Sequence, residues 1–193
     1  MACFHNFTVP VREIFFGNLS FFACSLFYLV WWIVVFRPGS TGGGKTGGVC
    51  LAAAFVTGIA ALALMAAGIN ALSPASGSVP VWHILLGGIL CFFILLPVTA
   101  FAFHRQVTSE LLIMHLWAVM QLSCIAVLRG TGHLGAGGAA ALTVLVGLAA
   151  VAGLVCYLLY YRLSGAASWW DGMVPLLSDA LVMAVFLGVT AVS

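Results

Sequence analysis

The chain has 193 residues, of which 64% are hydrophobic and only 5% are charged. Soluble domains carry about 25% charged residues, and six Lys or Arg with four Asp or Glu cannot solvate the surface of a 20.2 kDa globule. The composition therefore excludes a water-soluble fold, and the few scattered cations exclude a nucleic-acid-binding surface.

Six long apolar runs follow one another along the chain. A membrane-spanning helix needs about 20 consecutive apolar residues, and the runs that meet this length are 14–36, 48–72, 81–103, 108–128, 138–163 and 172–193. None shows the alternating polarity of a transmembrane β-strand. The sequence therefore predicts an all-α integral membrane protein in which residues 1–193 form a single bundle of six transmembrane helices with short loops.

The distribution of cations predicts the orientation of this bundle. Arg12 and Arg129 lie on the side of the two chain ends, whereas the opposite side carries the other four cations, which are Arg37, Lys45, Arg105 and Arg162. Cytoplasmic loops carry an excess of Lys and Arg. We therefore expect both termini outside, in the inner (plasma) membrane of a bacterium.

The first run carries polar side chains on one half of its circumference. Glu13 and Asn18 belong to this half, and amide or ionisable groups within a span are expensive in lipid and face protein or water. We expect this half of the helix to face a cavity or the bundle interior, and both residues are candidates for a substrate or proton pathway.

Small residues recur in the second and fifth runs, as in Ala54-x-x-x-Gly58, Ala63-x-x-x-Ala67-x-x-x-Ala71 and Ala149-x-x-x-Gly153. Such faces let membrane helices approach closely. They predict packing within the bundle, with a moving helix or a subunit interface of a homo-oligomer as the alternative. In the third run, Pro97 removes the hydrogen bond to the carbonyl of Phe93 and predicts a kink.

Gly39–Thr46 matches the phosphate-binding pattern G-x-x-x-x-G-K-[ST]. That pattern requires a preceding strand and an acidic residue near the magnesium ion. Here the preceding element is a membrane helix, so we expect no nucleotide binding.

Further polar residues lie inside the fourth and sixth runs. Glu110, His115 and Gln121 fall in the fourth run, and Gln121 lies near mid-membrane with Trp117 one turn away. If Asp171 caps the sixth helix, Asp179 lies about 12 Å deep. We expect Asp179 to face the interior, with His115 as its nearest partner by height, and to take part in proton transfer, gating or substrate binding. The alternative for each residue is a structural hydrogen bond between helices.

Histidines gather by sequence position at the outer mouth. His5, His83 and His133 fall on this side, where imidazoles can sense pH or bind Zn²⁺ or Cu²⁺. The pair His83 and His133 would also suit haem b, which needs two imidazoles at matched depth. Three ordinary interface histidines are the simpler interpretation.

These observations favour a channel or transporter for a small solute, with pH- or proton-dependent activity, over an enzyme. The chain offers several intramembrane polar residues on different helices and no loop that holds a soluble domain. Its expected partners are the lipid bilayer, the solute and further copies of itself. The alternatives are a haem-binding membrane anchor or redox subunit, and the substrate-binding subunit of a larger transporter.

Overall fold

The computed structural model of the chain describes residues 8–40, 44–77, 81–104 and 109–192. Its long helices are α1 (Val9–Phe36), α2 (Gly44–Leu72), α3 (Val81–Pro97), α4 (Ser109–Gly130), α5 (Ala136–Leu159) and α6 (Ala166–Val192). Short 3-10 turns, Ser73–Ala75 and Tyr160–Arg162, follow α2 and α5, and a π-helix, Val98–Ala102, follows α3. These ranges contain no strand. The predicted all-α bundle of six apolar helices is confirmed.

Four of the long helices begin earlier than the sequence predicted, and the difference is largest for the first and the sixth. The first begins at Val9, with Pro10 in its first turn, where the fixed φ of proline suits a helix start. The sixth begins at Ala166, directly after Gly165, whose φ of 60° ends the preceding turn. The expectation that Asp171 caps the sixth helix is therefore wrong, because hydropathy marks where a helix enters hydrocarbon and not where it starts.

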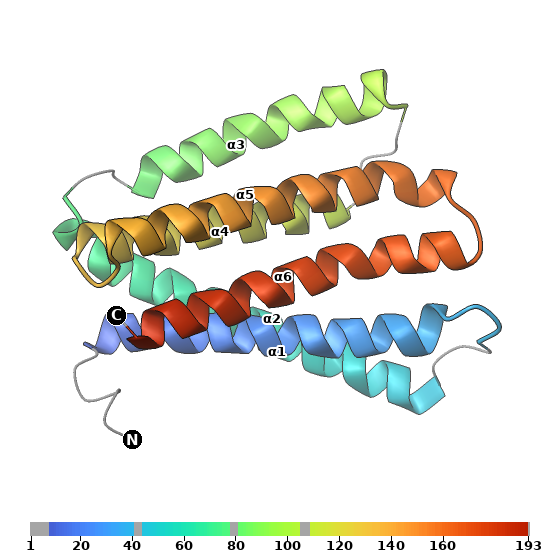
Figure 1. Cartoon of the computed structure of the whole chain (residues 1–193), viewed down its shortest axis with the longest axis horizontal. Coiled ribbons are helices and arrows are strands. Elements are labelled where there is room, and N and C mark those ends of the chain that lie inside the picture. Colours follow the sequence, from blue (N-terminus) through green and yellow to red (C-terminus); the bar gives the residue numbers. More distant parts are fainter. Residues whose placement is uncertain (1–7, 41–43, 78–80, 105–108, 193) are drawn as a thin grey trace.

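Five of the helices close a ring. Contacts join α1 to α2, α2 to α4, α4 to α5, α5 to α6, and α6 back to α1. The remaining long helix, α3, packs on α4 and stands apart from the others (Figure 1). The start of α1 and the end of α6 lie at the same end of the bundle, as an even number of spans requires (Figure 1).

Glycines allow α1 and α2 to pack closely along their length. A Cβ atom added to Gly68 would lie 2.7 Å from the carbonyl oxygen of Pro10, and one added to Gly17 would lie 3.0 Å from the backbone nitrogen of Met65. Because lipid tails are as apolar as the side chains, such close contact replaces the hydrophobic effect in holding membrane helices together.

The small-residue stripes of α2 divide between two faces. Ala54 is buried and Gly58 packs against Cys24 of α1, so this pair serves packing within the bundle. Ala63, Ala67 and Ala71 are exposed on the outside of the helix. In α5, Ala149 and Gly153 are buried, as expected for internal packing.

The third helix is peripheral. Val81 is its one buried residue, and Phe93 is 63% exposed. At Pro97, where a kink was predicted, the α-helix gives way to a π-helix that begins at Val98. Proline has no N–H to donate to the preceding turn. A local change to π-helix is one way in which a membrane helix adjusts to that missing hydrogen bond.

The segment Gly39–Thr46 joins two helices. Thr41–Gly43 lie outside the described residues, and Gly44, Lys45 and Thr46 form the first turn of α2. The described element before the segment is helix α1 and not a strand.

Candidate functional site

An amide pair bridges the interior of the ring between α1 and α4. Nε2 of Gln121 donates a hydrogen bond of 2.8 Å to Oδ1 of Asn18, and Nδ2 of Asn18 donates one of 2.9 Å to the carbonyl of Ile14. Both amide side chains are 0% exposed. By helical rise, each lies about 14 Å from the bundle end at which α1 begins and α4 ends. Two of the predicted pathway residues therefore meet deep inside the bundle.

This pair leaves hydrogen-bonding capacity unused. Oε1 of Gln121 and Nε1 of Trp117 are buried and have no hydrogen-bond partner among the described residues. Trp117 precedes Gln121 by one helical turn, about 6 Å along α4. An unsatisfied buried group costs about 1–3 kcal/mol. One acceptor and one donor at this spacing favour a small molecule that carries both a hydrogen-bond donor and an acceptor.

Polar groups continue along the same two helices toward the opposite end. Because α1 and α4 run antiparallel, Tyr28, which follows Asn18, comes near Glu110, which precedes Gln121, and the two are within electrostatic reach. Ser25 lies between Asn18 and Tyr28 and is 5% exposed. We call this row the α1–α4 seam; its members are Asn18, Ser25 and Tyr28 of α1, and Glu110, Trp117 and Gln121 of α4.

Asp179 lies in the middle of α6. Thirteen residues separate it from each end of the helix, which corresponds to about 20 Å and not the 12 Å predicted from a cap at Asp171. It shares a helical face with Pro175 and with Phe186, which is 0% exposed, so it faces the interior of the bundle. The side chain is half-buried and forms no hydrogen bond or ion pair with another described residue.

His115 and Glu13 do not join this residue or the seam. Nε2 of His115 donates a hydrogen bond of 2.7 Å to the carbonyl of Gly88, and its ring lies beside Phe92, so His115 attaches α3 to α4. The expected pairing of His115 with Asp179 is not formed, because the two side chains leave their helices in different directions. Glu13 is half-buried in the first turns of α1.

The predicted histidine cluster is described only in part. His83 is exposed and stacks on Trp82 with ring centroids 3.6 Å apart, and Nδ1 of His133 lies 3.2 Å from the carbonyl oxygen of Thr131. His5 lies outside the described residues. Within the described ranges, no three His, Cys, Asp or Glu side chains gather in a way that would hold a metal ion. A metal or haem at His5, His83 and His133 stays a prediction.

The sequence predicted the two amides as pathway candidates but not their pairing with each other. Asn18 and Gln121 are visible as polar residues in apolar runs, but no sequence signal pairs two residues that are 103 positions apart. The position of Trp117 one turn from Gln121 predicted either hydrogen bonding to a small neutral polar solute or a bond between helices. The sequence did not predict that the N–H of Trp117, a residue only 3% exposed, would be buried without a partner among the described residues.

Comparison of the chain with protein-family models, with curated proteins and with solved structures finds no match. The class of protein follows from the chain itself. Six helices are long and apolar enough to cross a bilayer, and large apolar side chains such as Phe55, Phe93 and Phe101 cover the outside of the bundle. The chain is a multi-pass membrane protein with a polar seam in its interior.

Proposed function

We propose that this membrane protein is a small channel or transporter for a small, neutral, polar solute, and that the α1–α4 seam binds the solute. The observation that carries the proposal is the unused acceptor on Gln121 beside the unused donor on Trp117, both buried. Such a pair is matched by a molecule that both donates and accepts hydrogen bonds, as urea, simple amides and polyols do.

The charges of the seam support a neutral solute over an ion. Its buried members carry no charge, and they are Asn18, Ser25, Trp117 and Gln121. Glu110 lies at the exposed start of α4. An ion would lose its hydration at this depth without an opposite charge in compensation. The interior is closely packed, with Met65 and Phe186 both at 0% exposure, so a pathway through the seam requires side chains or helices to move.

Asp179 supports a dependence on protons. A carboxylate deep in a membrane is expensive unless it is paired, hydrated or protonated, and Asp179 has no partner among the described residues. We propose that it takes up and releases a proton as the pathway opens, in a bundle whose termini face the outside of a bacterial inner membrane.

The proposal is tested by solute flux into proteoliposomes, measured by stopped-flow light scattering. Vesicles that contain the protein are expected to admit urea, acetamide or glycerol faster than protein-free vesicles do, while sodium chloride permeates both at the same rate. Equal rates for every neutral solute, or a faster rate for sodium chloride alone, would contradict a neutral-solute pathway.

A further inference from the structure

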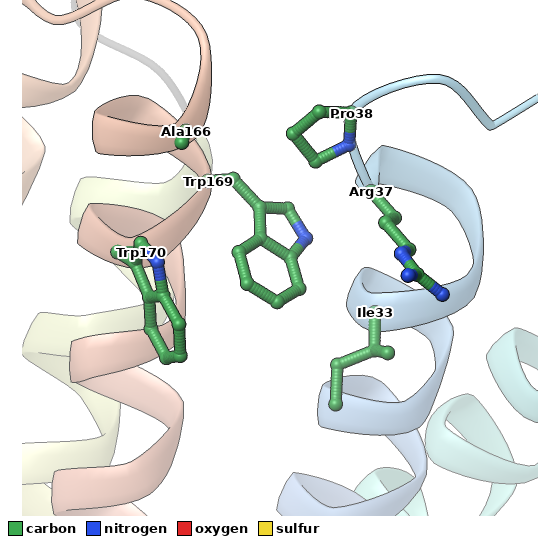
Figure 2. A pocket seen from close by; sticks show the side chains of 6 residues that line it. All are labelled: Ile33, Arg37, Pro38, Ala166, Trp169 and Trp170. Carbon is green, nitrogen blue, oxygen red and sulfur yellow. The ribbon is translucent and has the colours of Figure 1, made fainter.

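A hollow lies between the end of α1 and the beginning of α6, and its lining residues do not belong to the seam. Its volume is about 430 Å³, and its lining residues are Ile33, Arg37, Pro38, Ala166, Trp169 and Trp170. Figure 2 shows the ring of Trp169 between Trp170 and the α1 side, with its nitrogen directed toward α1, while the guanidinium of Arg37 is turned away from Trp169.

Two hydrogen-bond donors among the lining residues have no acceptor in the part of the chain that the structure describes. Nε1 of Trp169 is buried without a partner among the described residues. The guanidinium of Arg37 is exposed and forms no hydrogen bond or ion pair with any described residue. Both groups only donate hydrogen bonds. The matching ligand therefore supplies acceptor oxygens, and the cation favours negative charge on them.

No acid is among the lining residues, and Asp171, the acid of α6 nearest to them in sequence, does not occupy the hollow. Asp171 follows Trp169 by two residues, more than halfway around the helix, and contacts the thiol of Cys156 on α5. The hollow also lies at the first residue of α6, where the positive end of the helix dipole adds to the charge of Arg37.

The remaining lining is apolar and lies at the edge of the membrane. Ile33 and Trp170 belong to the spans of α1 and α6, and Trp170 is 59% exposed on the outside of the bundle. Tryptophan at the ends of spans lies at the level of the lipid headgroups. A ligand in this hollow thus meets donors and a positive charge toward the helix ends and apolar surface toward the hydrocarbon.

We infer that this hollow binds the headgroup of an anionic phospholipid. In this complex the exposed side chain of Arg37 turns toward the hollow and the indole of Trp169 shifts to uncover Nε1, so that both donate hydrogen bonds to the phosphate. The first part of the acyl chains lies on Ile33 and Trp170. The inference does not depend on the proposed transport function. Both α1 and α6 contribute to the hollow, so the bound lipid would join the first and last helices of the ring.

Native mass spectrometry of the purified full chain tests the inference, with phosphatidylglycerol and phosphatidylcholine added in separate titrations. Arg37→Gln removes the charge. Trp169→Phe removes the N–H, and it keeps the hydrogen bond that Trp32 donates to the backbone carbonyl of Trp169. Arg162→Gln is the matched control, because Arg162 is an exposed cation at the same end of the bundle and does not line the hollow.

We expect Arg37→Gln to weaken binding of phosphatidylglycerol about fivefold, Trp169→Phe to weaken it at least about fivefold, and Arg162→Gln to change it less than about twofold. Phosphatidylcholine should bind the wild type more weakly than phosphatidylglycerol does. The inference would be overturned if Arg37→Gln and Arg162→Gln lost the same affinity for phosphatidylglycerol. It would also be overturned if Trp169→Phe, with the melting temperature of the wild type, bound this lipid as tightly as the wild type does. Full competition by inorganic phosphate would overturn the assignment to a lipid.

Discussion

At the scale of single residues, the buried amide pair is the feature that most constrains function. Asn18 and Gln121 are 0% exposed and hydrogen-bonded to each other, so each satisfies part of the other's polar surface. Removing one partner leaves the second buried without its bond, which costs about 1–3 kcal/mol, whereas removing both costs less. A structural role and a solute-binding role therefore make different predictions for the same substitutions.

A double-mutant cycle measures the structural part of this pair. We expect Asn18→Leu and Gln121→Met each to lower the free energy of unfolding by about 1–3 kcal/mol. The double variant should lose less than the sum, with a coupling of about 0.6–1.7 kcal/mol. Unfolding in mixed detergent, followed by circular dichroism, gives these values. Strict additivity would show that the two side chains do not interact in the bilayer-like environment.

Substitution of Asp179 by Asn separates the effect of the charge of this side chain from the effect of its hydrogen bonding. Asp179→Asn keeps the shape and polarity of the side chain, so we expect the variant to insert and fold. We also expect its solute flux to lose the pH dependence of the wild type, measured from about pH 5 to pH 8, because an amide cannot take up and release a proton as a carboxyl group does. Identical pH profiles for both proteins would leave Asp179 with a structural role only.

The sequence predicted which residues matter here better than it predicted their partners. Intramembrane polarity alone singles out Asn18, Gln121 and Asp179, because each would be costly in lipid. The expected pairing of His115 with Asp179 was based on depth and failed, since direction around the helix also decides which side chains meet. The unsatisfied donor of Trp117 depends on packing around α4, which no pattern of apolar residues contains.

At the scale of helices, close packing and loose packing coexist in the same bundle. The α1–α2 pair is held by backbone-to-backbone approach at Gly17 and Gly68. By contrast, α3 contacts α4 at Gly88. The carbonyl of Gly88 accepts the hydrogen bond of His115, and Val119 of α4 packs against Gly88 and leaves no room for a larger side chain there. We therefore expect substitutions in the α1–α2 contact to destabilise the protein, and we expect α3 to move without disturbing the ring.

Gly68→Ala tests the close approach. The added Cβ would meet the backbone of Pro10 and Ile14, which cannot move aside as a flexible side chain can. We expect a loss of about 1–3 kcal/mol in the free energy of unfolding. Gly147→Ala in α5 is the control, because nothing lies within 4 Å of its added Cβ. The Gly147→Ala variant should be as stable as the wild type or slightly more stable. If Gly68→Ala were as stable as this control, α1 and α2 would not be in close contact at Gly68.

His115→Leu tests the attachment of α3. Loss of its hydrogen bond to Gly88 should increase amide hydrogen exchange in Val81–Pro97 and leave α1 and α2 unchanged. His133→Leu provides a comparison, since His133 bonds only within its own turn, to Thr131. Equal exchange of α3 in both variants would mean that His115 does not hold the helix.

At the scale of the whole molecule, hydropathy predicted the six helices because a bilayer admits only segments with an internally bonded backbone and an apolar surface. It did not predict the ring order or the peripheral place of α3. Every helix is apolar on most of its surface, so lipid-facing and protein-facing sides look alike in sequence. The interior is marked only by small and polar residues, such as Gly17 and Asn18.

The orientation of the bundle is open to direct measurement. The described cations Arg37, Lys45 and Arg162 lie at one end and Arg12 and Arg129 at the other. We expect the larger group to face the cytoplasm, so alkaline phosphatase fused after α6 should be active and green fluorescent protein fused there should stay dark. The reverse pattern would invert the orientation and leave the helix count intact.

Binding of a solute to Gln121 and Trp117 within the seam is tested by solute flux into proteoliposomes that contain the Gln121→Met variant. Ser123→Ala is the matched control, because Ser123 is equally buried on the same helix and bonds only to the carbonyl of Val119. We expect Gln121→Met to reduce flux of the permeant neutral solute at least about tenfold, the loss of one or more buried hydrogen bonds, and Ser123→Ala to retain wild-type flux. If folded Gln121→Met carried the solute as fast as the wild type does, the solute would not bind Gln121 and the proposal would be wrong.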